Sequence, residues 1–241
     1  MKKIIRNKCV ICENTKFCTL KNVKNSPVYM GASKGEEYYF NDLKFVSCNN
    51  CNTIQLKELI PLEILYKNNH NTEVIGQLWK EHNERFSEFI SLNKPNKIVE
   101  IGDPSLKFFN MLKNNDWLKK WTIIEPNHLY AEYNEKLKII KNFFDSLETA
   151  EEILDADAYI LSHVFEHFYE PNEIMKKIDS FTEESTMLFL SVPDMRFILN
   201  NKLLPPASLC FEHTFFADLN NIEFLLNKNN YMILFYFNKY F

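Results

Sequence analysis

Four cysteines near the start of the chain have the spacing of metal ligands. They form two Cys-x-x-Cys units, Cys9 to Cys12 and Cys48 to Cys51, separated by residues 13–47. Two such units give the tetrahedral set of four thiolates that zinc favours. Four protein ligands leave no open position, so we expect a structural zinc ion. Buried or redox-active thiols are the alternative reading of the same spacing.

Two later segments combine histidine with glutamate, the residues that most often move protons in enzymes. The segment "LSHVFEHFYEP" contains His163, Glu166 and His167, and "FEHTFF" contains His213 after Glu212. We take His213 as the candidate general base, oriented by Glu212, and His163, Glu166 and His167 as further candidate catalytic residues. The alternatives are a polar helix start for the first group and, for His213, a histidine that bridges loop carbonyls.

The segment "KIVEIGDPSLKFF" begins as a nucleotide-binding turn does, with a short apolar run that leads into Glu100 and Gly102. The next apolar run ends in "IIEPN", which places Glu125 at its tip. An acid about 20 residues after the first turn is the usual ligand of ribose hydroxyls in dinucleotide-binding folds. A solvated acid at a strand end is the alternative. After the third run, Asn142 and Phe143 could meet an adenine by hydrogen bonding and stacking.

The elements that must position these residues alternate between strands and helices after residue 96. Short apolar runs predict strands, and three- and four-residue periodicity predicts helices between them. This alternation predicts an α/β fold, a doubly wound, mainly parallel sheet. We expect strands at 97–101, 121–125, 136–144, 157–164, 185–192 and 231–238, and helices around 105–115, 129–137, 146–154, 171–180 and 218–229, with Asp145 and Glu148 as a capping box of the third.

The segment before this region is different. Residues 1–68 are loop-rich and cannot bury much surface, so we expect a small zinc-binding domain that the metal stabilises. Residues 69–95 read as a connecting amphipathic helix, and residues 96–241 as the nucleotide-binding domain. Within the helix we expect a surface or interface role for His82. Cys18 and Cys210 have no partner pattern and are expected in the core.

The ordered set of motifs resembles a known family. The chain resembles class I S-adenosylmethionine (SAM)-dependent methyltransferases that carry an N-terminal zinc-binding domain, a group that includes sugar C-methyltransferases. The segments "VSCNNCNTIQL" and "PLEILYKNN" look like the family's second cysteine unit and the segment after that unit. "VEIG", "IIEPN" and "SHVFEHFYEPNEIM" are similar to its first, second and fourth methyltransferase motifs, and "FEHTFFADLNNIEFLL" to a later Glu-His-aromatic segment.

The resemblance implies a Rossmann-like methyltransferase domain with SAM as cofactor and zinc as a structural ion. The cofactor residues that we assign on this basis are Glu100, Gly102, Asp103, Glu125, Asn142, Phe143 and Ser162. The chain departs from the family after Gly102, where Pro104 and Leu106 stand at positions that are usually glycine. Either this loop binds the cofactor along an altered path, or binding is weakened or lost. The family's sheet also has a last antiparallel strand, for which the chain is one strand short.

Composition limits the partners. The chain has 28 Lys and Arg against 32 Asp and Glu, a net charge of −4, with no basic run. Binding to nucleic acid needs clustered cations, so we expect no nucleic-acid partner. We see no apolar run long enough to span a membrane and no signal peptide, and therefore expect a cytoplasmic protein. The oligomeric state is not legible.

The leading hypothesis is a methyltransferase that acts on a small activated metabolite. We expect a nucleotide-linked sugar or a phosphoryl-type precursor of a bacterial capsule or surface polysaccharide. The second hypothesis is a non-catalytic binding protein that kept the methyltransferase fold and lost SAM binding. The third, a zinc-ribbon RNA methyltransferase, is disfavoured by the acidic charge balance.

Overall fold

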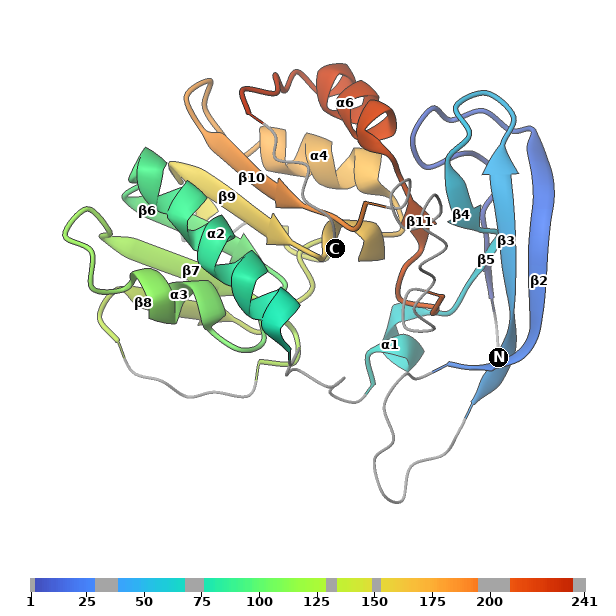
Figure 1. The fold of residues 1–241 in the computed structure, drawn as a ribbon, viewed down its shortest axis with the longest axis horizontal. Coiled ribbons are helices and arrows are strands. Elements are labelled where there is room, and N and C mark those ends of the chain that lie inside the picture. Colours follow the sequence, from blue (N-terminus) through green and yellow to red (C-terminus); the bar gives the residue numbers. More distant parts are fainter. Residues whose placement is uncertain are drawn as a thin grey trace. The chain divides into compact units, whose positions relative to one another are not determined.

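The computed structural model describes residues 3–28, 39–67, 76–128, 134–148, 153–194 and 209–235. The chain divides into two compact units, which we describe separately (Figure 1). Unit 1 comprises Met1–His70, Glu166–Lys176 and Pro193–Phe241, and unit 2 comprises Asn71–Phe165 and Lys177–Val192. The division by sequence into 1–68, 69–95 and 96–241 stays a prediction about domains.

Unit 2 is built on a five-stranded sheet in which every pair of neighbouring strands is parallel. Its order is β10-β9-β6-β7-β8, so the first strand of the unit is central and the order reverses beside it, between β6 and β9. This is the doubly wound arrangement, and it confirms the predicted fold class. The strands are β6 (Lys97–Ile101), β7 (Lys120–Ile124), β8 (Leu137–Ile140), β9 (Ala158–Ser162) and β10 (Met187–Ser191).

Two helices cover one face of this sheet (Figure 1). They are α2 (Gln77–Asn93) and α3 (Lys107–Leu112). Phe86 and Ile90 of α2 and Phe108 of α3 pack in one core with strand residues such as Trp121. Side chains from both helices and from four strands therefore share one apolar layer. Close packing in this layer holds the strands and their carboxyl ends in place.

Two predicted helices of unit 2 differ from the structure over part of their described residues. In the helix expected at 129–137, residues 135–136 form a turn and Leu137 already begins β8; residues 129–133 lie outside the described residues. In the helix expected at 146–154, residues 146–148 are not helical, so Asp145 and Glu148 form no capping box there, whereas Ile153 lies in a 3-10 turn and residues 149–152 lie outside the described residues. Both segments are short and polar, and local periodicity over so few residues does not separate a helix from a turn.

Unit 1 contains a four-stranded sheet of order β11-β4-β3-β2, in which all neighbours are antiparallel, and a separate pair of β1 with β5. The sequence predicted a loop-rich segment over residues 1–68 and missed β2, whose polar residues do not alternate with apolar ones. It also could not predict that β11, far along the chain, pairs with β4. The strands are β1 (Ile4–Ile5), β2 (Phe17–Pro27), β3 (Phe40–Cys48), β4 (Ile54–Leu56), β5 (Glu58–Leu59) and β11 (Phe215–Phe216).

The helices expected at 171–180 and 218–229 are present as α4 (Pro171–Asp179) and α6 (Leu219–Lys228). The short helix α1 (Leu62–Leu65) was not predicted. Asp218 caps α6 and forms a capping box with Asn221. The strand expected at 231–238 is wrong over residues 231–235, which have no regular structure, and the rest lies outside the described residues.

Two smaller expectations have opposite outcomes. Cys210 is buried as predicted, whereas Cys18 is exposed on β2. None of the helices in the described ranges is both long and apolar enough to cross a membrane.

Candidate functional site

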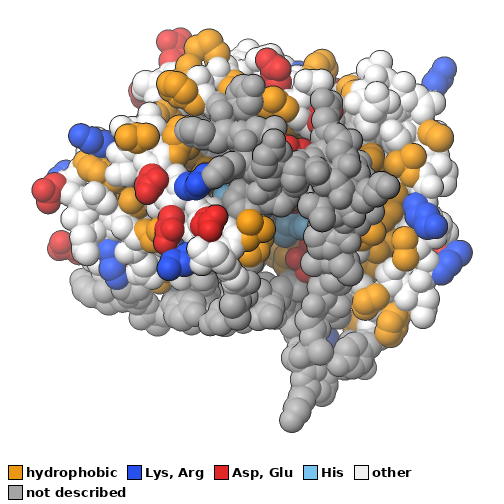
Figure 2. Space-filling model, viewed as in Figure 1, with side chains coloured by type: hydrophobic (Ala, Val, Ile, Leu, Met, Phe, Trp, Pro, Cys, Tyr) orange, Lys and Arg blue, Asp and Glu red, His pale blue; other side chains and the backbone are white. Residues whose placement is uncertain are grey.

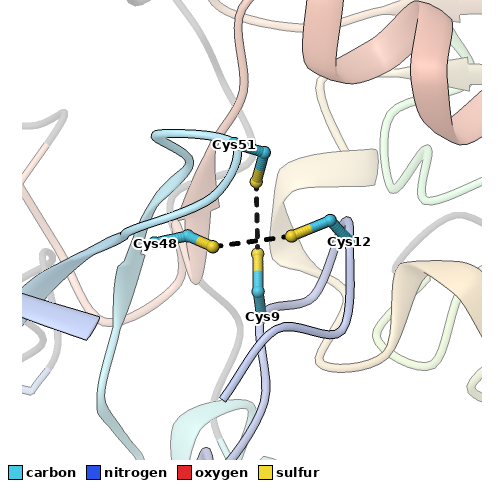
Figure 3. Close-up of side chains that lie close together, drawn as sticks. All are labelled: Cys9, Cys12, Cys48 and Cys51. Carbon is cyan, nitrogen blue, oxygen red and sulfur yellow. Dashed lines mark hydrogen bonds between the residues drawn. The ribbon is translucent and has the colours of Figure 1, made fainter. Parts of the chain in front are cut away.

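The four cysteines of the two Cys-x-x-Cys units converge in unit 1 (Figure 3). The Sγ atoms of Cys9 and Cys51 lie 3.5 Å apart, as do those of Cys12 and Cys48. All four sulfurs lie within 4.8 Å of one another. Sulfurs around a tetrahedral zinc ion lie about 3.8 Å apart, because the zinc–sulfur bond is about 2.3 Å, whereas a disulfide needs about 2.05 Å. The donor set fits a zinc ion and does not form a disulfide.

The two loops that carry these cysteines have the same backbone pattern. The N–H of Glu13 donates to the carbonyl of Cys9 at 2.9 Å, and that of Asn52 to the carbonyl of Cys48 at 3.0 Å. Both donors have positive φ, 61° and 59°. The N–H of Asn50 also donates to the Cys48 sulfur. Two loops far apart in sequence thus take one conformation that turns sulfurs and amides inward, as expected of a shared metal.

The sulfurs share protons in the way that metal-binding thiols do. The hydrogen bond between the Cys9 and Cys51 sulfurs lowers the pKa of Cys51 to about 4 and raises the pKa of Cys9. Thr53 Oγ1 lies 3.0 Å from the Cys51 sulfur and supports its thiolate form. The site therefore offers a thiolate before any ion binds.

In unit 2, Gly102 links the carboxyl ends of three neighbouring strands. It follows β6 with φ of 81°, in the region that favours glycine. Its N–H donates to the carbonyl of Ile124 at 3.0 Å, the residue before Glu125. A Cβ at this position would lie 2.5 Å from Cγ2 of Val164, just after β9. Gly102 is thus required both for the turn and for the close packing beside it.

The loop after Gly102 is organised by Asp103. Its Oδ1 accepts hydrogen bonds from the N–H and the hydroxyl of Ser105, at 3.0 and 2.8 Å, and its Oδ2 accepts from the N–H of Lys107 at 2.9 Å. Asp103 is only 1% exposed. Its carboxylate binds amides of the kind that a glycine-rich loop turns towards an anionic ligand. The Asp103 carboxylate thus occupies loop amides that could otherwise bind an anionic ligand.

Leu106 takes a left-handed backbone conformation, in the region that favours glycine. It has φ of 60°, which costs about 1–2 kcal/mol for a residue with a Cβ. Its side chain is buried in the core between α2, α3 and the sheet, and burial of a leucine contributes a similar amount. The side chain therefore points into the core and does not fill the outer side of the loop.

Glu100 lies inside unit 2, at 1% exposure, and Trp121 donates to its Oε2 at 3.0 Å. Burial, and secondarily the charge of Asp103, raises the pKa of the Glu100 carboxyl well above its ordinary value. The side chain of Glu100 supports the loop from within the sheet.

Three predicted cofactor residues follow the carboxyl ends of β7 and β8, which are neighbours in the sheet. Glu125 is half-buried, and its Oε1 accepts from the N–H of Asn127 at 2.8 Å. Its own N–H donates to Ile140 of β8. Asn142 and Phe143 are also half-buried, and the Asn142 side chain accepts from the N–H of Phe143. The structure brings these residues to one edge of the sheet.

Ser162 and His163, at the end of β9, meet two residues of α2. Nε2 of His82 lies 3.3 Å from the Ser162 hydroxyl. The His163 ring contacts the rings of Trp79 and His82, with centroids 4.7 and 4.8 Å away. His163 has φ of 52°, a strained conformation for a residue with a side chain. These residues lie where the strand order reverses, which is where doubly wound folds bind ligands.

His82 is a residue that the sequence analysis misplaced. It is buried rather than on the surface. Burial, then the nearby His163 and Lys107, lowers its pKa to about 3, so the imidazole is neutral at physiological pH. Its helical spacing from Trp79 and Phe86 puts it on the apolar stripe of α2, and this signal could have identified it.

The other three candidate catalytic residues come together in unit 1. The ligand atoms of Glu166, His167 and His213 lie within 4.8 Å of one another. The His167 and His213 rings have centroids 5.1 Å apart, and the Tyr66 hydroxyl lies 3.1 Å from Nδ1 of His167. His163 belongs to unit 2 and packs with His82 instead. We call Glu166, His167 and His213 the His-Glu cluster.

No protein-family model matches the chain, and no curated protein matches it. Among solved structures, it is similar to the methyltransferase domain of a bacterial Hen1, CtHen1-CN, with a TM-score of 0.46 and 13% identity over 64% of this chain and 84% of that one. The plantazolicin methyltransferase BpumL in complex with SAH gives 0.48 and 15%, over 63% and 68%. These are distant likenesses, so the fold assignment rests on the strand order and register of unit 2.

Proposed function

We propose that the protein is a SAM-dependent methyltransferase that acts on a small activated metabolite. The observation that carries this proposal is a backbone hydrogen bond at the carboxyl ends of the strands of unit 2. It joins the glycine turn after β6 to the residue before Glu125. A glycine turn and an acid on adjacent parallel strands are what a nucleoside cofactor needs at this edge.

In this proposal each cofactor residue has a distinct task. Glu125 accepts hydrogen bonds from the ribose hydroxyls, and Asn142 and Phe143 contact the adenine. Gly102 lets the backbone approach the cofactor, Glu100 and Asp103 hold the loop around it, and Ser162 lines the site. When bound, SAM supplies a methyl group on a sulfonium.

The His-Glu cluster would position the acceptor of the methyl group and take up its proton. The nucleophilic atom of the acceptor would receive the methyl group, and the sulfur of SAM would be the leaving group and keep the bonding electron pair. A sugar hydroxyl or carbon acid must also lose a proton, which passes to His213, with His167 and Glu166 beside it. His163, which follows β9, is a further candidate catalytic residue in this proposal. A phosphoryl oxygen is already anionic and needs positioning only.

We propose a nucleotide-linked sugar or a phosphoryl-type precursor of a bacterial surface polysaccharide as the acceptor. On the face in Figure 2, acidic and basic side chains are interspersed over unit 2, which together with the net charge of −4 supports a small-molecule acceptor over a nucleic acid. Zinc at the four cysteines would stabilise unit 1, and a reducing cytoplasm would keep those thiols available.

The test is methyl transfer with a panel of acceptors. We expect SAM-dependent methylation, detected by mass spectrometry, of a nucleotide sugar or a phosphoryl compound, with turnover reduced about 100-fold or more in His213→Ala. The control is Glu63→Gln, at an exposed position of α1 in the same unit. Methylation that is equally fast in His213→Ala contradicts the role of this residue.

One observation favours a second candidate, a methyltransferase-fold protein without SAM binding. The Asp103 carboxylate binds the loop amides of Ser105 and Lys107, so a cofactor carboxylate has to bind elsewhere or displace it. Direct titration with SAM separates the two candidates, because only the enzyme binds it.

A further inference from the structure

We propose that the His-Glu cluster binds one divalent transition-metal ion, separate from the ion at the four cysteines, and that this ion holds a hydroxyl or phosphoryl oxygen of the acceptor. The role of the ion rests on the proposed function. Its binding does not, because all three ligands belong to unit 1 and no cofactor is involved.

The donor set is the first argument. One carboxylate and two imidazoles form the set that zinc, iron, manganese and cobalt share in catalytic sites. Ligand atoms around such an ion lie about 3–3.4 Å apart, because the metal–ligand bonds are about 2.0–2.2 Å. The three ligand atoms lie within 4.8 Å of one another, so small side-chain rotations close the site.

The second argument is the orientation of His167. The Tyr66 hydroxyl lies 3.1 Å from Nδ1, so the ring would bind an ion through its other nitrogen, Nε2. A histidine that binds a metal usually has a polar partner on its other nitrogen, which fixes the ring. Tyr66 therefore has the position of such a partner.

The third argument is that the backbone around the cluster is held in place. The N–H of Thr214 donates to the carbonyl of Glu166 at 2.9 Å, and its hydroxyl donates to the carbonyl of Phe168 at 2.7 Å. The buried Arg6 side chain donates to Thr214 and to the carbonyl of Tyr169. The segment with Glu166 and His167 is thereby tied to the one with His213, so the ligands are positioned before an ion binds.

The fourth argument is the burial of Glu166, whose side chain is only 4% exposed. A buried carboxylate is costly unless a positive charge or hydrogen bonds offset the cost. A divalent ion would place a positive charge beside this carboxylate, in a site where three protein ligands leave coordination positions open. The four-cysteine site has no such open position, so the two sites would differ in role.

The ion would also change how the acceptor loses its proton. A hydroxyl bound to a divalent ion has a lowered pKa and can release its proton to water. With the ion bound, His167 and His213 would be ligands, and release of the proton to water would replace the base role proposed for His213 above. This deepens the proposed substrate class, because an acceptor with a hydroxyl or phosphoryl oxygen binds such an ion and a carbon acid without one does not.

The experiment uses Co²⁺ as the probe, on the full chain with one equivalent of Zn²⁺ already at the cysteines. We expect one further equivalent of Co²⁺ with weak visible d–d bands and no thiolate charge-transfer bands. Glu166→Gln and His213→Gln should weaken this binding about 100-fold or more, and Tyr66→Phe about 10- to 100-fold. Glu63→Gln, the same exchange at an exposed glutamate of unit 1, is the matched control and should bind Co²⁺ as the unaltered protein does.

Absence of a second equivalent at millimolar Co²⁺ in the unaltered protein would overturn the proposal, whether or not the variants fold. Equal affinity in the unaltered protein and a folded Glu166→Gln variant would also overturn it. Both results are independent of SAM, so failure of the metal site is distinguishable from failure to bind the cofactor.

Discussion

Unit 1 and unit 2 bury polar groups in different ways. In unit 1, buried polar side chains join segments that are distant in sequence: Arg6 binds the backbone at Thr214, Asn172 donates to the carbonyl of Val10, and Asn221 donates to that of Cys51. In unit 2, four buried polar side chains gather at one edge of the sheet, those of Glu100, Asp103, His82 and Ser162.

The difference shows what each unit needs. The buried apolar cluster described in unit 1 is smaller than the one described in unit 2, so side-chain hydrogen bonds and a four-sulfur centre help to hold unit 1 together. Unit 2 has a large apolar layer under a parallel sheet and can place polar groups where a ligand binds. Unit 1 should therefore depend on its metal, and unit 2 on its packing.

The largest effect should follow from Cys48→Ser. Structural zinc contributes about 10 kcal/mol or more in small metal domains, so loss of one ligand should unfold unit 1. Hydrogen exchange should show loss of protection in β3 and β4, with protection retained in β6, β7 and β9. Cys18→Ser, at an exposed cysteine outside the cluster, is the control and should change neither unit. Full protection of β3 in Cys48→Ser would contradict the claim that unit 1 depends on its metal.

The next effect concerns Gly102. Gly102→Ala should cost about 3 kcal/mol, because the substitution adds backbone strain and a clash with Val164. Gly76→Ala is a matched control, since Gly76 has φ of 135° but no atom within 4 Å of an added Cβ, and should cost only about 1 kcal/mol. Urea unfolding measures both. Val164→Ala should recover part of the loss in Gly102→Ala; equal costs at the two glycines would show that the close packing is unimportant.

A smaller effect concerns pH. The pKa of His82 is about 3 in the folded protein and about 6.5 in the unfolded chain, so only the unfolded chain takes up a proton as pH falls below 6.5. Stability should fall by about 2 kcal/mol between pH 8 and pH 5 through this group. His82→Gln should remove that part of the pH dependence in urea unfolding. The same slope in both proteins contradicts a neutral, buried His82.

The smallest effect should come from Glu100→Gln. The raised pKa of Glu100 means that the folded state favours the protonated carboxyl, while the unfolded chain ionises above about 4.5. This group therefore destabilises the fold increasingly as pH rises above that value. Glu100→Gln keeps the bond from Trp121 and should be within about 1 kcal/mol of the unaltered protein at pH 5 and relatively more stable at pH 8. Relative destabilisation at pH 8 would show that Glu100 is ionised.

The sequence predicted what local patterns encode. The cysteine spacing, the strands of the parallel sheet and the amphipathic helix α2 all follow from short-range periodicity or spacing, and the structure contains them. The strand β2 was missed because its sequence, "FCTLKNVKNSP", lacks alternation. The strand β11 was missed because its pairing with β4 depends on contacts across the whole chain.

The candidate site was predictable to the same extent. Gly102 and Glu125 could be placed at the ends of two consecutive predicted strands from the apolar runs in the sequence. The contact of His82 with Ser162 and His163, and the use of loop amides by Asp103, depend on side-chain packing between elements. Leu106 illustrates the reason: its left-handed backbone is unfavourable locally and is stabilised by burial in the core, which no local pattern reports.

The central claim, that unit 2 binds SAM, is tested most directly by calorimetric titration with SAM. The account predicts saturable binding with a Kd below about 100 µM, abolished in Glu125→Ala and retained in Glu173→Ala, a matched control at an exposed glutamate that pairs with Lys176. No heat at millimolar SAM, or unchanged affinity in Glu125→Ala, would contradict it.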